Sequence, residues 1–206
     1  MGHGRLESAA RGNIAWFGRY GIGMDSFLEL VRRRQSTRRF LPDPVPREVV
    51  DRCLEAARLA PSACNSQPWS FLAVDDPATL ARVGAAAFGG VYAMNAFAKS
   101  APVLVVVETH PSAAAARFGG WLQRTEFNLL DVGCACAHLI LQAECEGLGS
   151  CWLGWFDKGA VRRELGLPRR ARIDSLIALG RPAEPLLRPK LRRPLEEVRR
   201  WFSVPR

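Results

Sequence analysis

The chain has 206 residues, of which 48% are hydrophobic, which is enough for one well-buried domain but not for two. No apolar run approaches the roughly 18 residues of a membrane-spanning helix, so we expect a soluble, cytoplasmic protein. The net charge of +9 arises entirely within residues 158–206, which hold 14 Lys and Arg against 5 Asp and Glu. Such a basic segment suits nucleic acid, an anionic surface or a single phosphate ligand.

The N-terminal part of the chain divides into a loose arm and the start of the domain. Residues 1–24 are glycine-rich without a sustained period, and the domain is expected over residues 25–206. A helix is predicted from Asp25, which can cap it, and Arg34 falls on its apolar stripe. A guanidinium there either meets an anion or extends into solvent from the last turn. Residues 34–40 then cluster guanidinium, hydroxyl and amide donors, which favours a phosphate and polyol site.

A stiff polar loop connects the second helix to the first strand. Pro46 is predicted as the first residue of that helix, and residues 70–74 read as a short buried strand. Between them, residues 60–69 combine two prolines with Ser, Asn and Gln donors and acceptors. This composition suits a cofactor site, although an ordinary helix-to-strand connection has a similar composition.

The middle of the chain contains the strongest strand. Asp75 and Asp76 precede Pro77 and cap a third helix, and residues 92–99 form a short helix. Residues 102–107 are a continuous apolar run, which predicts a strand buried on both faces. Residues 110–120 are rich in Ala and Gly and form either a mobile lid or a short surface helix.

Residues 121–148 are predicted to form the longest helix. The helix is apolar nearly all round, so it belongs in the centre of the fold or in a subunit interface. We interpret His138 as a core residue that forms a hydrogen bond. Cys134 and Cys136 point about 200° apart on a helix and cannot bind one metal ion together. The six cysteines are interpreted as reduced core residues.

The last quarter of the chain contains two strands and a proline-rich arm. Residues 150–155 and 173–179 are predicted strands, and Asp157 caps a short helix between them. The arm over residues 181–206 has little core pattern until Trp201, so it needs a surface such as a partner subunit. The sequence contains no dinucleotide-binding glycine motif, Walker loop or nucleophile triad.

Four segments in consistent order resemble the FMN-dependent nitroreductase family of flavin oxidoreductases, and the similarity extends over residues 25–201. The segments are residues 34–40, 60–69, 147–154 and 189–194. The resemblance implies an α+β, three-layer fold with a central, mostly antiparallel sheet flanked by helices. It also implies a homodimer with FMN at the subunit interface, in which the C-terminal arm, residues 181–206, extends onto the partner.

The resemblance implies a role for individual residues around FMN. The residues at the phosphate would be Arg34, Lys190 and Arg192, with Gln35 and Ser36 near the phosphate and ribityl chain, and Arg38 toward the pyrimidine edge. The loop from the other subunit would contribute Pro61, Ser62, Ala63, Asn65 and Gln67. Asn95 would be a further flavin contact, and the backbone around Leu153, Gly154 and Trp155 would approach flavin N5.

The implied activity is a ping-pong reaction through flavin N5. NADH or NADPH gives a hydride to the flavin and leaves, and a nitroaromatic, quinone or related small electron-poor acceptor then takes the electrons. FMN carries the chemistry, so we expect no catalytic side chain, no metal and neither nucleic acid nor membrane as a partner.

Other functions remain open at this point. Within the superfamily, a dehalogenase, a flavin-fragmenting enzyme or an azoline oxidase would differ mainly in the lid segments, residues 88–95 and 110–123. From other classes, the basic tail allows a nucleic-acid-binding protein, and a dimeric flavin-binding regulator without turnover is a third hypothesis.

Overall fold

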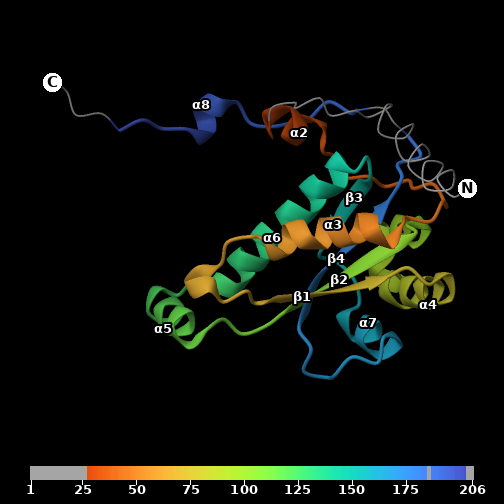
Figure 1. Cartoon of the computed structure of the whole chain (residues 1–206), viewed down its shortest axis with the longest axis horizontal. Helices are drawn as coiled ribbons and strands as arrows, with labels where there is room; N and C mark the ends of the chain where they lie inside the picture. The colour runs from red at the N-terminus through yellow and green to blue at the C-terminus, as the bar shows by residue number, and fades with distance from the viewer. Residues whose placement is uncertain (1–26, 185–186, 203–206) are drawn as a thin grey trace, which may run out of the picture.

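The computed structural model describes residues 27–184 and 187–202, so the predicted arm over residues 1–24 and the cap at Asp25 lie outside it. A central sheet consists of strands β1 (Trp69–Val74), β2 (Val103–Thr109), β3 (Gly149–Leu153) and β4 (Ile173–Gly180). The strands follow the order β1-β2-β4-β3, and every pair is antiparallel (Figure 1). The mostly antiparallel sheet expected from the sequence is confirmed.

Helices cover both faces of this sheet. Helices α3 (Arg47–Arg58) and α6 (Phe127–Cys145) pack on one face and cross in front of the sheet in Figure 1. Helices α4 (Pro77–Ala87), η2 (Gly90–Ser100) and α7 (Lys158–Glu164) pack on the other. Alternate residues of β2 enter the two cores: Val105 belongs to the first and Val106 to the second, and both are fully buried. The three-layer arrangement follows because neither sheet face can remain in water.

The predicted helix over residues 121–148 is wrong at its start, because two helices share this region. Helix α5 (Ala114–Gln123) ends at Arg124, whose φ of 53° is left-handed, and α6 begins only at Phe127. The reversal is tight, since a Cβ on Gly120 would lie 2.5 Å from the Thr125 carbonyl oxygen. Of the two alternatives for residues 110–120, the structure therefore contains the short surface helix.

Most other helix boundaries agree with the sequence patterns. Asp76 caps α4 by accepting a bond from the Thr79 backbone N–H at 2.8 Å, and Asp157 caps α7 in the same way. Pro46 is a correction, because it is the residue before α3 rather than the first residue within it. The helix predicted over residues 92–99 is a run of 3₁₀ turns, η2.

Two predictions of burial are also wrong. The apolar stripe of α2 (Phe27–Arg33) contains no buried residue, and Phe27 is 70% exposed. Cys64 and Cys134 are exposed rather than in the core, whereas Cys136 is buried. The different environments of Cys134 and Cys136 follow from helix geometry, which turns residues two apart to different sides.

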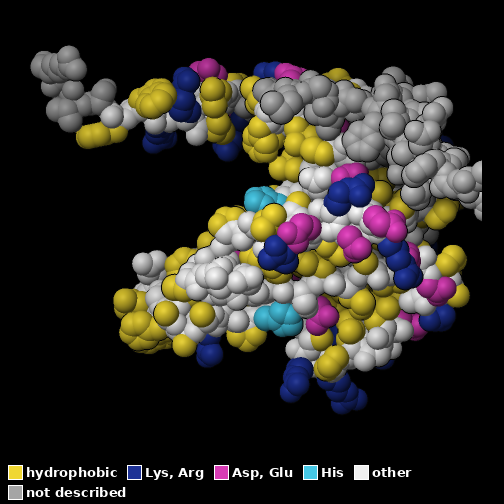
Figure 2. Space-filling view, viewed as in Figure 1, with side chains coloured by type: hydrophobic (Ala, Val, Ile, Leu, Met, Phe, Trp, Pro, Cys, Tyr) yellow, Lys and Arg dark blue, Asp and Glu magenta, His cyan; other side chains and the backbone are white. Residues whose placement is uncertain are grey.

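The C-terminal arm runs past α2, forms the short helix α8 (Leu195–Val198) and projects clear of the body (Figures 1 and 2). Its apolar side chains are uncovered, with Leu191 90%, Trp201 83% and Phe202 95% exposed. The arm is therefore an apolar surface with no packing partner in the described part of the chain. Among the described residues, every helix is too short or too polar to cross a membrane.

Candidate functional site

The donor-rich segment over residues 34–41 lies along the edge of the sheet beside β3. The Thr37 backbone N–H donates to the Ser150 carbonyl oxygen at 2.8 Å, and Ser36 forms a parallel bridge with Ser150. The contact requires glycine at position 149, because a Cβ there would lie 2.4 Å from the Thr37 hydroxyl oxygen. At its far end, the Leu41 N–H donates to the Arg181 carbonyl oxygen at 2.8 Å. The segment is therefore fixed against the folded core.

The start of the C-terminal arm returns to this segment. The Arg188 side chain and backbone N–H both donate to Gln35 Oε1 at 3.3 Å, and the Arg188 guanidinium also donates to the Ser36 carbonyl oxygen. Lys190 Nζ donates to the Val31 carbonyl oxygen. Arg188 is not among the predicted site residues, because the family-like run over residues 189–194 begins one residue after it.

Like charges surround Lys190. Burial lowers the pKa of this lysine, Arg34 and Arg192 lower it further, and Glu144 opposes the shift. Burial also raises the pKa of Glu144, although Arg33, Arg34 and Lys190 oppose that rise. We call Arg34, Arg188, Lys190 and Arg192 the cation cluster. The predicted phosphate residues thus do converge, from opposite ends of the sequence.

A second group of predicted residues lies near the C-terminal end of β3. The Arg38 guanidinium carbon lies 5.9 Å from the centre of the Phe97 ring. Asn95 Nδ2 donates to the Trp155 carbonyl oxygen at 2.8 Å, and the Trp155 ring N–H donates to the Val91 carbonyl oxygen at 3.0 Å. The Trp155 ring is thereby held toward η2.

The backbone after β3 is open to approach. Leu153 is buried, Gly154 is exposed, and a Cβ on Gly154 would meet no heavy atom within 4 Å. The surroundings of Cys151 show that this group and the cation cluster are neighbours. Burial raises the pKa of the Cys151 thiol. Arg38 of this group opposes the rise, and so do Arg188 and Arg34 of the cation cluster.

The polar loop over residues 61–67 is held by its own hydrogen bonds and by one buried carboxylate. The Ala63 backbone N–H donates to both carboxylate oxygens of Asp131 at 3.1 Å. Within the loop, the Gln67 backbone N–H donates to Ser62 Oγ at 3.0 Å, and Gln67 Nε2 donates to Asn65 Oδ1 at 3.2 Å. Asp131 is not among the predicted site residues, and the available signal is that it is a charged residue on an otherwise mostly apolar helix.

This loop has an unusual backbone. The φ angles of Cys64 and Asn65 are both 51° and that of Gln67 is 45°, although left-handed values are uncommon for residues other than glycine. Pro61 and Asn65 are exposed at its surface. Strain of this kind persists only where surrounding contacts impose it, and it concentrates at functional sites.

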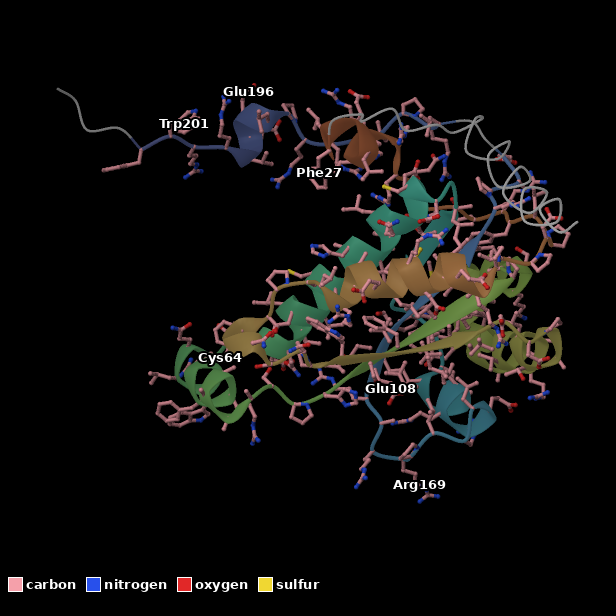
Figure 3. All side chains as sticks on the ribbon, in the orientation of Figure 1. Phe27, Cys64, Glu108, Arg169, Glu196 and Trp201 are labelled. Carbon is pink, nitrogen blue, oxygen red and sulfur yellow. The ribbon has the colours of Figure 1, made fainter. Side chains whose placement is uncertain are left out.

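The loop and the cation cluster lie at opposite ends of α6. Asp131 anchors the loop near the start of the helix, and Glu144 interacts with Arg34 and Lys190 near its end. At 1.5 Å per residue, these two positions are about 20 Å apart. Figure 3 shows the same separation, with Cys64 beside α5 and Phe27 over the other end of α6. One chain therefore does not bring its loop to its own cation cluster.

Comparisons with curated proteins identify relatives along most of the chain. An NADH dehydrogenase of Thermus thermophilus is 36% identical, and the match covers 82% of this chain and 92% of the relative. A 5,6-dimethylbenzimidazole synthase of Rhodobacter capsulatus is 32% identical, covering 77% and 84%. An iodotyrosine deiodinase of Thermotoga neapolitana is 28% identical, covering 79% and 91%.

Solved structures share the fold. A nitroreductase family protein from Streptococcus pneumoniae superposes with a TM-score of 0.72 at 27% identity, covering 86% of this chain and all of the other. A nitroreductase from Desulfovibrio desulfuricans, solved in complex with FMN, has a TM-score of 0.69 at 28% identity, covering 88% and 99%. The family model described as "Nitroreductase family" matches residues 31–181. The chain therefore belongs to the nitroreductase family of oxidoreductases.

Proposed function

We propose that this protein is an FMN-dependent oxidoreductase that uses NADH or NADPH to reduce small electron-poor acceptors by a ping-pong reaction. The observation that carries the proposal is the cation cluster, where residues from both ends of the chain meet beside the edge strand β3. Among the described residues, Glu144 is the one carboxylate that interacts with any of these four cations. Burial raises the pKa of Glu144 and so makes this carboxylate harder to ionise.

The residues of this cluster fit the phosphate of FMN. Guanidinium and ammonium groups supply donors only, so they suit a dianion that accepts several hydrogen bonds. Burial lowers the pKa of Lys190, and the repulsion from Arg34 and Arg192 that lowers it further would be relieved by such a dianion. Gln35 and Ser36 lie between Arg34 and Arg38 in the sequence, and we assign them to the ribityl chain.

The flavin ring would lie toward the C-terminal end of β3. There Arg38 is supported by Phe97, and we assign it to the pyrimidine edge. The exposed Gly154 leaves the main chain accessible, and the Asn95 bond to Trp155 orders this segment. When bound, FMN supplies the hydride chemistry, whereas the protein binds and orients it.

We further propose that the working unit is a homodimer with the cofactor at the subunit interface. The distance of about 20 Å along α6 supports the assignment of the loop, residues 61–67, to the partner's cofactor. The exposed Leu191, Trp201 and Phe202 on the arm supply the apolar surface that association would bury.

We propose nitroaromatics, quinones and related compounds as the acceptors. Helix α5 supports this choice, because it presents Phe118 and Trp121 at its surface, 66% and 75% exposed, with ring centres 6.2 Å apart. Exposed aromatic rings suit stacking against flat, electron-poor molecules.

A direct experiment tests this function. The purified protein is mixed with FMN, separated from free FMN, and assayed for NADH and NADPH oxidation with a nitroaromatic, a quinone and an iodotyrosine as acceptors. We expect retained flavin absorbance and faster oxidation with the first two acceptors. A protein that retains no FMN, or that retains it without turnover with either reductant, would contradict the proposal.

A further inference from the structure

A second site lies in a cavity of about 470 Å³ between the end of β2, helix α5, the start of α6 and the loop before β4. Its lining includes His110, Ser112, Arg117, Arg170 and Arg172. The volume is within the usual range for small-molecule sites. None of these residues belongs to the FMN contacts proposed above.

The cavity has an excess of positive charge. Arg172 is neutralised by Glu126, at 3.3 Å, and by Asp174, at 2.7 Å. The guanidinium groups of Arg117 and Arg170 form no hydrogen bond or ion pair with any other residue that the structure describes. Two guanidinium groups from different segments therefore remain available to one anion in the cavity.

Neutral donors line the same space. Ser112 is 8% exposed, and its hydroxyl group makes no hydrogen bond to another described residue, although it lines the cavity. The ten-residue helix α5 begins here without a side-chain cap. An uncapped helix N-terminus favours negative charge, which adds to the effect of the two arginines.

The wall of the cavity is attached to the strained loop. The Ala113 backbone N–H donates to Ser66 Oγ at 3.0 Å, and the His110 N–H donates to the Pro68 carbonyl oxygen at 2.8 Å. Ser70 Oγ and His110 Nε2 are a further 2.8 Å pair. An anion in the cavity would therefore be held next to the loop that we assign to the partner's FMN.

We propose that this cavity binds the phosphate groups of a phosphorylated small molecule. The identity of the ligand rests on the function proposed above. With that function, the ligand is the diphosphate of NADH or NADPH, whose nicotinamide must reach the flavin. Two free guanidinium groups match a diphosphate in charge, and the cavity can accommodate the adjoining sugar.

The first test measures binding without turnover. Pyrophosphate and ADP-ribose are titrated by calorimetry into the FMN-loaded wild type, a variant with both Arg117→Ala and Arg170→Ala, and the control Arg169→Ala. Arg169 is adjacent in sequence and basic but does not line the cavity, and Figure 3 shows it at the outer bend of its loop. Because Arg117 and Arg170 have no described partner, their replacement should preserve the fold.

We expect each guanidinium removed to raise the dissociation constants of both probes by about tenfold or more in the double variant. The Arg169→Ala control should bind both probes as tightly as the wild type does. Equal affinities in all three proteins would overturn the proposal. Binding of pyrophosphate without ADP-ribose would identify a phosphorylated acceptor rather than the reductant as the source of the phosphate.

The second test separates this inference from the proposed function. In the double variant, KM for NADH should rise while kcat and FMN content stay at wild-type values. An unchanged KM would overturn the assignment to the reductant. A protein that binds pyrophosphate in an arginine-dependent way but oxidises no NADH would support the cavity and refute the proposed function.

Discussion

The two halves of the proposed FMN site are built on opposite physical principles. The hydrogen bonds of the loop over residues 61–67 are made within its own chain, either inside the loop or to Asp131. Three of its residues have left-handed φ angles. The cation cluster differs in both respects. None of its residues has a left-handed φ angle, and its charges repel one another. The loop is therefore pre-organised by backbone geometry, whereas the cluster gains most when an anion is bound.

This contrast assigns different consequences to mutations in the two regions. Changes in the loop anchor should reduce the stability of the protein, because a partly buried backbone donor loses its partner. Changes in the cation cluster should reduce ligand affinity and leave stability nearly unaffected, since they remove repulsion as well as contacts. The following predictions test this division, from the largest expected effect to the smallest.

The largest effect is expected for Lys190→Ala. Removing one charge-assisted bond of about 1.5–3 kcal/mol should raise the dissociation constant of FMN by about tenfold to one hundredfold. Fluorescence titration of FMN measures this, and Arg193→Ala, in the same basic run but outside the cluster, is the matched control. An equal loss in both variants would mean that only overall charge matters.

The second prediction concerns the anchor of the loop. Asp131→Ala leaves the Ala63 backbone N–H without its carboxylate partner and should lower the free energy of unfolding by about 1–3 kcal/mol. Urea denaturation measures the change, and Asp131→Asn, which retains one acceptor oxygen, should lose less. If Asp131→Ala were as stable as the wild type, the loop would not depend on this anchor.

The smallest effect is the pH dependence of FMN binding. Because the pKa of Lys190 is lowered from 10.5, the folded protein loses this proton at a lower pH than an ordinary lysine does. The affinity for FMN should therefore decline as pH rises toward 10.5, and Lys190→Arg should flatten this decline because arginine stays charged. If the affinity for FMN declined equally with pH in the wild type and in Lys190→Arg, Lys190 would be excluded as the source of the pH dependence.

The sign for stability is opposite. A lowered lysine pKa means that the unfolded chain binds this proton more tightly than the folded chain does. The contribution of Lys190 to stability without FMN should consequently rise with pH up to about 10.5, and urea midpoints measured along this range would detect it.

Local sequence patterns predicted the four strands, the helix caps at Asp76 and Asp157, and the segments from which the site is drawn. These features depend on hydrophobic period and capping chemistry, which act over a few residues. The patterns did not predict the break at Arg124, because residues 121–127 contain no proline or glycine that would end a helix. The turn is evident only from the close contact of Gly120 with Thr125 and from the left-handed φ of Arg124.

The sequence by itself determined the strands and the donor-rich segments, because period, prolines and side-chain chemistry are local properties. The class of fold was indicated by the resemblance of four segments to the nitroreductase family. Only the tertiary structure decided that Arg188 donates to Gln35, that Asp131 accepts from Ala63, and that the two halves of the proposed site lie about 20 Å apart along α6. Those facts depend on how distant segments pack around the sheet, and the spacing of residues along the chain contains no measure of that distance.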